Sequence, residues 1–325
     1  MILFAQFEPA SGLDVFISKL IDGLALGAIY ALLALGFVII FKATQVLNFA
    51  HGAIAAVGAY LVAYTAVTLN IPGRWFPDLH PGIQWTISII VGTLMAALVG
   101  MIIERLFIRP MIGQPLFSIA MITIGLDIVL RTIVDDLLGL GANVDTGSPF
   151  ELLSTSNVSG IIIPHAYIWT IGVAVVVVTA VALFFRTRLG VAMRATAFDQ
   201  EAAMAQGISA ARIFAISWAI GAALAAIGGV FASVTPRGFG VNSGTAFTAF
   251  RAFPAIVIGG LDSIVGAVVG GFIVGIAEVM AGHYLAQYTG ALGVGFTGVV
   301  PYLLMMVVLL IWPWGLFGTE EIRRV

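Results

Sequence analysis

The sequence has no cysteine and few charged residues. Without cysteine, its 325 residues can form no disulfide, thiolate nucleophile or cysteine-ligated metal site. Asp, Glu, Lys and Arg together make up 9% of the chain and apolar residues 61%, whereas a soluble domain carries about 25% charged residues. So few charges cannot cover a chain of this size with a water-compatible surface. The composition therefore excludes a soluble protein.

Several stretches lack charge altogether and exceed the roughly 20 residues that cross a bilayer core as a helix. The charge-free runs are 23–41, 43–73, 79–103, 152–185, 213–236 and 279–319. They predict an all-α polytopic membrane protein in which residues 1–325 form a single transmembrane domain. We expect eight spans, near 16–41, 47–69, 84–107, 116–138, 164–185, 213–234, 264–282 and 294–316.

A ninth apolar segment, 247–261, is short for a full crossing and predicts a short, broken helix. Pro254 and the pair Gly259–Gly260 are expected to interrupt it. The total of 38 glycines indicates closely packed or broken helices, because small residues let membrane helices approach one another.

Orientation follows from the basic residues, which favour the cytoplasmic side. The densest cluster lies in 186–212, so this loop is expected in the cytoplasm and the N-terminus outside. Nine of the fourteen basic residues then fall on the cytoplasmic side if Arg323 and Arg324 are also inside. Eight spans that start from an outer N-terminus would leave Arg323 and Arg324 outside. These arginines lie inside only if 247–261 crosses the membrane or reaches its cytoplasmic face, with 261–263 as the turn.

The cytoplasmic loop 186–212 contains Glu201-Ala202-Ala203-x3-Gly207. Residues 194–206 have the composition of a helix, and Gly207 suits a left-handed C-terminal cap. On such a helix Arg194, Phe198 and Glu201 share one face. Charge alone is also compatible with a solvated connector. The motif resembles the coupling helix with which permeases of ABC importers dock on a separate ATPase subunit, although the usual downstream Leu-Pro is absent.

A second constellation, Asn48-x2-His51-Gly52, begins an apolar helix. Polar side chains within a membrane usually face a bundle interior or a cavity. Asn48 is therefore a candidate helix N-cap and His51 a candidate cavity or gating residue. An interfacial cap with a histidine at headgroup depth is the alternative. Asn48, His51 and Gly52, with Gly259 and Gly260, are candidates for the translocation path.

Three further ionisable residues fall within predicted spans. Asp127 and Arg131 are four residues apart and can pair on one helix face. They form either a shielded ion pair or part of the path lining. Glu278 is expected to make a structural hydrogen bond between helices.

Some site types are missing from the sequence. A Walker A loop needs Gly-Lys-[Ser/Thr], but Lys19 and Lys42 follow Ser18 and Phe41. We therefore expect the chain to bind no nucleotide cofactor itself. With four histidines and no cysteine, neither a metal site nor covalent catalysis is expected, and nothing indicates nucleic-acid binding.

Longer motifs resemble one family in order along nearly the whole chain. GAIYALLALGFVIIFKATQVLNFAHGAIAAVGAY (27–60), RLGVAMRATAFDQEAAMAQGI (188–208), AIVIGGLDSIVGAVVGG (255–271) and WGLFG (314–318) are similar to signatures of LivH-type permeases of branched-chain amino acid ABC transporters. Three positions depart from the usual pattern, namely Ala53, Asp262 and Trp312-Pro313. These departures weaken inferences about the substrate more than inferences about the family.

The resemblance implies an ABC importer permease in a bacterial inner membrane. It also implies a second, LivM-like permease, two ATPase subunits that bind ATP and Mg²⁺, and an extracytoplasmic solute-binding protein, besides membrane lipid. Branched-chain amino acids are the favoured solutes, with urea, short amides and other small solutes as alternatives. The competing hypothesis is an ion-coupled secondary transporter or channel that uses Asp127, Arg131, Glu278 and His51 as a relay.

Overall fold

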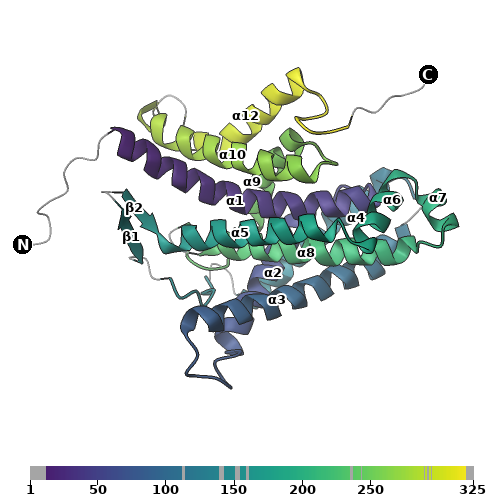
Figure 1. Ribbon diagram of the computed structural model, residues 1–325, viewed down its shortest axis with the longest axis horizontal. Coiled ribbons are helices and arrows are strands. Elements are labelled where there is room, and N and C mark those ends of the chain that lie inside the picture. The colour runs from purple at the N-terminus through teal and green to yellow at the C-terminus, as the bar shows by residue number, and fades with distance from the viewer. Residues whose placement is uncertain are drawn as a thin grey trace, which may run out of the picture.

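The computed structural model is a bundle of helices that run roughly along its long axis (Figure 1). It describes residues 12–111, 114–138, 143–150, 154–158, 161–234, 237–242, 244–288, 290, 293 and 295–319. The predicted outer N-terminus, 1–11, and the basic tail with Arg323 and Arg324 lie outside the described residues.

Within the described residues, seven helical stretches are long and apolar enough to cross a membrane. They are α1 (Gly12–Thr44), α2 with a π-helical turn (His51–Thr68), α3 with its extension (Pro81–Met111), α4 (Leu116–Leu138), α5 (His165–Phe184), α8 (Ala210–Ser233) and α10 (Ile264–Tyr284). Two apolar helices are shorter, α9 (Thr245–Gly259) and α12 (Phe296–Ile311). The chain is thus an all-α polytopic membrane protein.

Two short helices, α6 (Arg188–Phe198) and α7 (Gln200–Ala205), lie at one end of the bundle. A hairpin of β1 (Thr155–Val158) and β2 (Ile161–Pro164) lies at the other end (Figure 1). Its strands are antiparallel and pair Ser156 with Ile163.

Helix α1 forms the centre of the bundle and packs against α5, α8, α9 and α10. From Ala25 to Ile40 it is buried on every side, as expected of a helix that is hydrophobic all round. Close approach to α10 depends on glycines spaced four apart, Gly23 and Gly27 on α1 and Gly271 and Gly275 on α10. A β-carbon at Gly27 would lie 2.8 Å from Phe272 Cα.

Two predicted spans are longer than the helices that form. The span expected at 47–69 begins as a helix only at His51. The span expected at 294–316 is helical only over 296–311, because Trp312 leaves helical geometry and Pro313 follows it.

Pro254 does not interrupt α9, which is continuous to Gly259. A proline within a helix leaves the carbonyl four residues earlier without its N–H partner. Here that carbonyl belongs to Phe250, and the Tyr302 hydroxyl of α12 donates a hydrogen bond to it at 3.1 Å. Gly260, with a φ of 104°, ends the helix as expected.

Candidate functional site

Basic residues from distant parts of the sequence gather at one end of the bundle, which we call the basic end. Lys42, near the end of α1, donates a hydrogen bond to the carbonyl oxygen of Asp262 at 2.8 Å. Arg109 donates one to the carbonyl oxygen of Ala211 at 3.0 Å, which ties the extension of α3 to the start of α8. These contacts tie α1 to the α9–α10 turn and α3 to α8, and α6 packs against both α1 and α8 at this end.

Arg109 also neutralises a carboxylate that water does not reach. Glu104 is 0% exposed. Nε and Nη2 of Arg109 donate to its two carboxylate oxygens at 3.1 and 2.8 Å. This two-point ion pair compensates the desolvation of the carboxylate and fixes the junction between α3 and α8.

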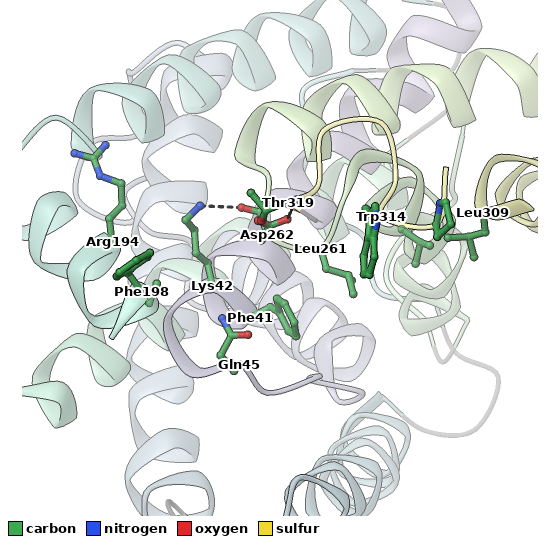
Figure 2. Close-up of a pocket in the computed structure, with 13 residues that line it drawn as sticks. Phe41, Lys42, Gln45, Arg194, Phe198, Leu261, Asp262, Leu309, Trp314 and Thr319 are labelled. Atoms are coloured by element: carbon green, nitrogen blue, oxygen red, sulfur yellow. Dashed lines mark hydrogen bonds between the residues drawn. The ribbon is translucent and has the colours of Figure 1, made fainter. Parts of the chain in front are cut away.

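A cavity of about 610 Å³ lies at the basic end (Figure 2). Helix α6 contributes Arg194 and Phe198, the end of α1 contributes Lys42, and the α9–α10 turn contributes Asp262. The full lining is Phe41, Lys42, Gln45, Arg194, Ala197, Phe198, Val257, Leu261, Asp262, Leu309, Pro313, Trp314 and Thr319. Phe198 is 95% exposed, so most of this large apolar ring packs on nothing within the described residues.

The predicted continuous helix over 194–206 was wrong, since the chain breaks at Asp199. The backbone of Asp199 is extended (φ −152°, ψ 106°), and its carboxylate accepts a hydrogen bond from Ala202 N at 2.9 Å. Asp199 therefore caps α7 separately from α6. Arg194 and Phe198 lie on α6 and Glu201 on α7, so the three do not share the face of one helix.

The remaining predicted features of the segment are placed as follows. Glu201 and Ala202 are exposed on α7, and Ala203 is buried. Gly207 has a φ of 82°, so the expected left-handed residue follows α7. Met193 of α6 is buried in a cluster with Phe185 and Phe214, so that α6 is anchored while α7 presents its motif outward.

Asn48 and His51 lie inside the bundle. Asn48 is not the N-cap of α2, because that position is Ala50; the Asn48 Oδ1 accepts a hydrogen bond from Ala50 N at 3.1 Å. His51 Nε2 lies 2.9 Å from the carbonyl oxygen of Leu33, near the middle of α1. A histidine at headgroup depth is therefore excluded.

The segment between α1 and α2 re-enters the bundle without helical structure. Gln45, with a φ of 55°, turns the chain. Irregular backbone at membrane depth needs protein partners for its polar groups, and Thr123 of α4 supplies two. Its hydroxyl accepts from Phe49 N and contacts the carbonyl oxygen of Leu47, both at 3.2 Å. No local pattern around Thr123 indicates that it fills this role.

A small cavity of about 20 Å³ adjoins this segment. It is lined by Phe37, Asn48, Phe49, His51, Gly52, Ala249, Phe250, Phe253 and Ile256. Asn48 Nδ2 and His51 Nδ1 are buried and have no hydrogen-bond partner among the described residues. The cavity is large enough for about one water molecule.

Gly259 and Gly260 are not part of that cavity lining. They lie at the basic end, where Gly260 allows the C-terminal segment to approach. A β-carbon there would lie 2.5 Å from Gly318 N. The five predicted path residues therefore fall at two different depths.

The predicted ion pair between Asp127 and Arg131 is present, with Nη2 and Oδ2 2.8 Å apart. The guanidinium of Arg131 also lies over two aromatic rings of α9, 4.5 Å from the centroid of Phe247 and 5.1 Å from that of Phe250. The pair is thus packed between α4 and α9.

Glu278 makes the expected hydrogen bond between helices: the Tyr30 hydroxyl donates to its Oε2 at 2.6 Å. Its other oxygen, Oε1, lies 3.7 Å from Arg251 Nη1. Arg251 lies within α9. Arg237 donates a hydrogen bond to the carbonyl oxygen of Asp22 at 3.0 Å.

Comparison with known proteins adds a match along nearly the whole chain. Residues 19–309 match the family model described as the permease component of the branched-chain amino acid transport system. The high-affinity branched-chain amino acid transport permease LivH of Salmonella typhimurium is 31% identical over 321 residues, covering 95% of this chain and 98% of that protein.

Two further relatives extend the likeness. The corresponding permease BraD of Pseudomonas aeruginosa is 32% identical over 95% of this chain and 98% of its own length. The probable LivH of Methanocaldococcus jannaschii is 28% identical over 89% of this chain and 88% of its own length. No solved structure matches the chain.

Proposed function

Since the chain belongs to the permease family of branched-chain amino acid transport systems, we propose that it conducts branched-chain amino acids as one subunit of an ABC importer. The near full-length match to LivH and BraD carries this proposal. A second, LivM-like permease would complete the path, two ATPase subunits would bind ATP and Mg²⁺, and an extracytoplasmic binding protein would deliver the solute. This chain would be a transport subunit without catalysis of its own.

We propose that the segment α6–α7 couples ATP hydrolysis to the membrane helices. Exposed Glu201, Ala202 and Phe198 are available to a partner, and Gly207 ends the motif. Movement of α6 would reach the bundle through Met193, which packs in one cluster with Ala43 of α1 and Phe214 of α8. Arg194 and Phe198 also line the cavity beside Lys42 and Asp262, so displacement of α6 would change that cavity.

The solute path is proposed to pass the buried polar groups of Asn48 and His51 beside Gly52, and to reach the basic end near Gly259 and Gly260. The small volume of the cavity at Asn48 and His51 supports a closed conformation at this depth. Opening would require α9 to move relative to α2, because Phe250 and Phe253 of α9 form the opposite wall.

We propose that the basic end faces the cytoplasm of a bacterial inner membrane, with the N-terminus outside. The supporting observation is that Lys42, Arg109 and Arg194 lie at the same end as the turn 261–263. In this placement α9 ends and α10 begins at the cytoplasmic side.

Cysteine scanning tests this orientation in a chain that has no cysteine of its own. The variant Ser263→Cys is expected to react with a membrane-impermeant maleimide only when the cytoplasmic side is exposed. Asp78→Cys, in the loop before α3, is the matched control and is expected to react from outside. Labelling of Ser263→Cys from outside in intact cells would contradict the proposed orientation.

The proposed activity is tested by solute uptake into proteoliposomes. With partner subunits present, leucine uptake is expected to require both internal ATP and external binding protein. Omission of either is expected to reduce the uptake rate at least about tenfold, to the leak level. The reason is that the path through the permeases opens only when the ATPase subunits close on ATP, and the solute has no other route across the membrane. Uptake by the chain alone, driven by a proton or sodium gradient, would instead support the ion-coupled alternative.

A further inference from the structure

The first half of α9 presents an aromatic and cationic face that the bundle leaves uncovered. Phe247 and Arg251 are exposed, and Thr248 and Phe250 are partly exposed. These positions are three and four residues apart and so lie on one side of the helix. The opposite side, which includes Ala249 and Ala252, is buried.

The face lies well inside the membrane. Glu278, the contact of Arg251, is bonded to Tyr30, which is fourteen residues before the end of α1 at Thr44, or about 21 Å along a helix. On the other side of the face, Arg131 pairs with Asp127, which is equally distant in sequence from the two ends of α4. Glu278 lies six residues, about 9 Å, before α10 ends at Tyr284, so both ion pairs flank α9 within the length of the long helices.

The two guanidinium groups beside this face differ in how they are held. Arg131 has a short ion pair at 2.8 Å and two aromatic neighbours. Arg251 has a 3.7 Å contact with Glu278, its side chain is 55% exposed, and it donates no hydrogen bond within the described part of the chain. Arg251 thus keeps free N–H donors in the fork geometry that binds a carboxylate at two points.

Lipid contact does not account for this face. An arginine at the centre of a lipid-exposed helix costs roughly 2.5–3.5 kcal/mol on insertion scales. The exposed large side chains of α3 include Ile90, Leu94 and Leu98, and those of α5 include Val175 and Val176. These helices suit lipid, whereas the face of α9 suits water, a solute or another protein.

We infer that Arg251 binds the carboxylate of the transported amino acid, while the rings of Phe247 and Phe250 contact its apolar side chain. The inference rests on the proposed function, because it takes an amino acid as the solute. Glu278 Oε1 holds Arg251 loosely, so a solute carboxylate can replace it without leaving the guanidinium unpaired. Such exchange favours release, which a transport path needs as much as binding.

Cysteine labelling tests whether the face is aqueous and positively charged. In membranes containing the chain with its partner subunits, Thr248→Cys is expected to react with water-soluble methanethiosulfonates, and faster with the sulfonate reagent than with the trimethylammonium one. Adding Arg251→Gln is expected to lower that rate ratio several-fold. Leucine is expected to slow labelling more than leucine amide, which lacks the carboxylate. Val176→Cys, 68% exposed on α5, is the control and is expected to stay unreactive in lipid.

Transport supplies the second readout. Arg251→Gln is expected to reduce the maximal leucine uptake rate at least about tenfold at saturating binding protein, and Arg251→Lys to restore part of it. An unreactive Thr248→Cys in an active transporter, equal protection by leucine and leucine amide, or full uptake by Arg251→Gln would each overturn the inference. The inference would also be overturned if Arg251→Gln lost uptake but left the ratio of the two labelling rates unchanged, because Arg251 would then form only a structural ion pair.

The two proposals fail in different ways. If the wild-type transporter takes up no branched-chain amino acid, the proposed function fails, whatever the labelling shows. If the wild-type transporter takes up branched-chain amino acids and Arg251→Gln leaves that uptake unchanged, the proposed function stands, but the proposed role of Arg251 fails.

Discussion

Replacing Gly271 by valine is expected to destabilise the folded chain strongly. A β-carbon at this position would lie 2.5 Å from Ala31 N and 2.7 Å from Ala31 Cα, both backbone atoms of the central helix α1. A backbone cannot move aside as the end of a flexible side chain can, so α10 must separate from α1. Overpacking typically costs about 1–3 kcal/mol, and we expect the upper end of this range. The yield of monodisperse protein in detergent and its midpoint of thermal unfolding measure the effect.

Gly172→Val is the matched control. Gly172 lies on α5, and in the part of the chain that the structure describes no atom outside its own helix lies within 4 Å of where its β-carbon would be. The same change there is expected to leave the yield and the unfolding midpoint nearly unchanged. If Gly271→Val were as stable as Gly172→Val, the fold would not require the close packing of α1 against α10.

The long apolar runs of the sequence predicted an all-α membrane protein, but not the number of long helices: eight spans were expected, and seven helices within the described residues are long enough to cross a membrane. Helix ends were less predictable. Residues 47–50 are apolar enough to extend a helix, but they form the irregular segment whose backbone groups bond to Thr123. Only the packing of α4 beside this segment makes that conformation possible. Similarly, α9 continues through Pro254 because Tyr302, 48 residues later, satisfies the carbonyl of Phe250.

The candidate site was predictable where its parts are close in sequence. Asp127 and Arg131 pair as their spacing indicates, and Gly207 takes the positive φ that its position suggests. The composition of 194–206 favours one continuous helix and so did not reveal the break at Asp199, although aspartate is a common N-cap residue. Glu278 contacts both Arg251 and Tyr30 and so joins three helices, which no local pattern could reveal.

Glu201→Arg is expected to weaken docking of the ATPase subunits and to reduce transport while the chain stays folded. Glu201 is exposed in the first turn of α7, where a negative charge favours the helix by about 0.3–1 kcal/mol. The effect on stability is therefore expected to be small. If α7 docks on an ATPase subunit, reversing this charge opposes docking, and a loss of about 1.4 kcal/mol already means tenfold weaker association.

Three measurements on the same preparation separate these effects. Co-purification with the ATPase subunits and leucine uptake are both expected to fall at least about tenfold, and the unfolding midpoint of the chain to stay nearly constant. Asp78→Arg makes the same charge change in the exposed loop before α3, and is expected to leave ATPase co-purification intact. Normal assembly and normal uptake by Glu201→Arg would contradict the assignment of α7 to coupling. The exposed Phe198 ring and the cavity beside it would then be the remaining contact for a partner at the basic end.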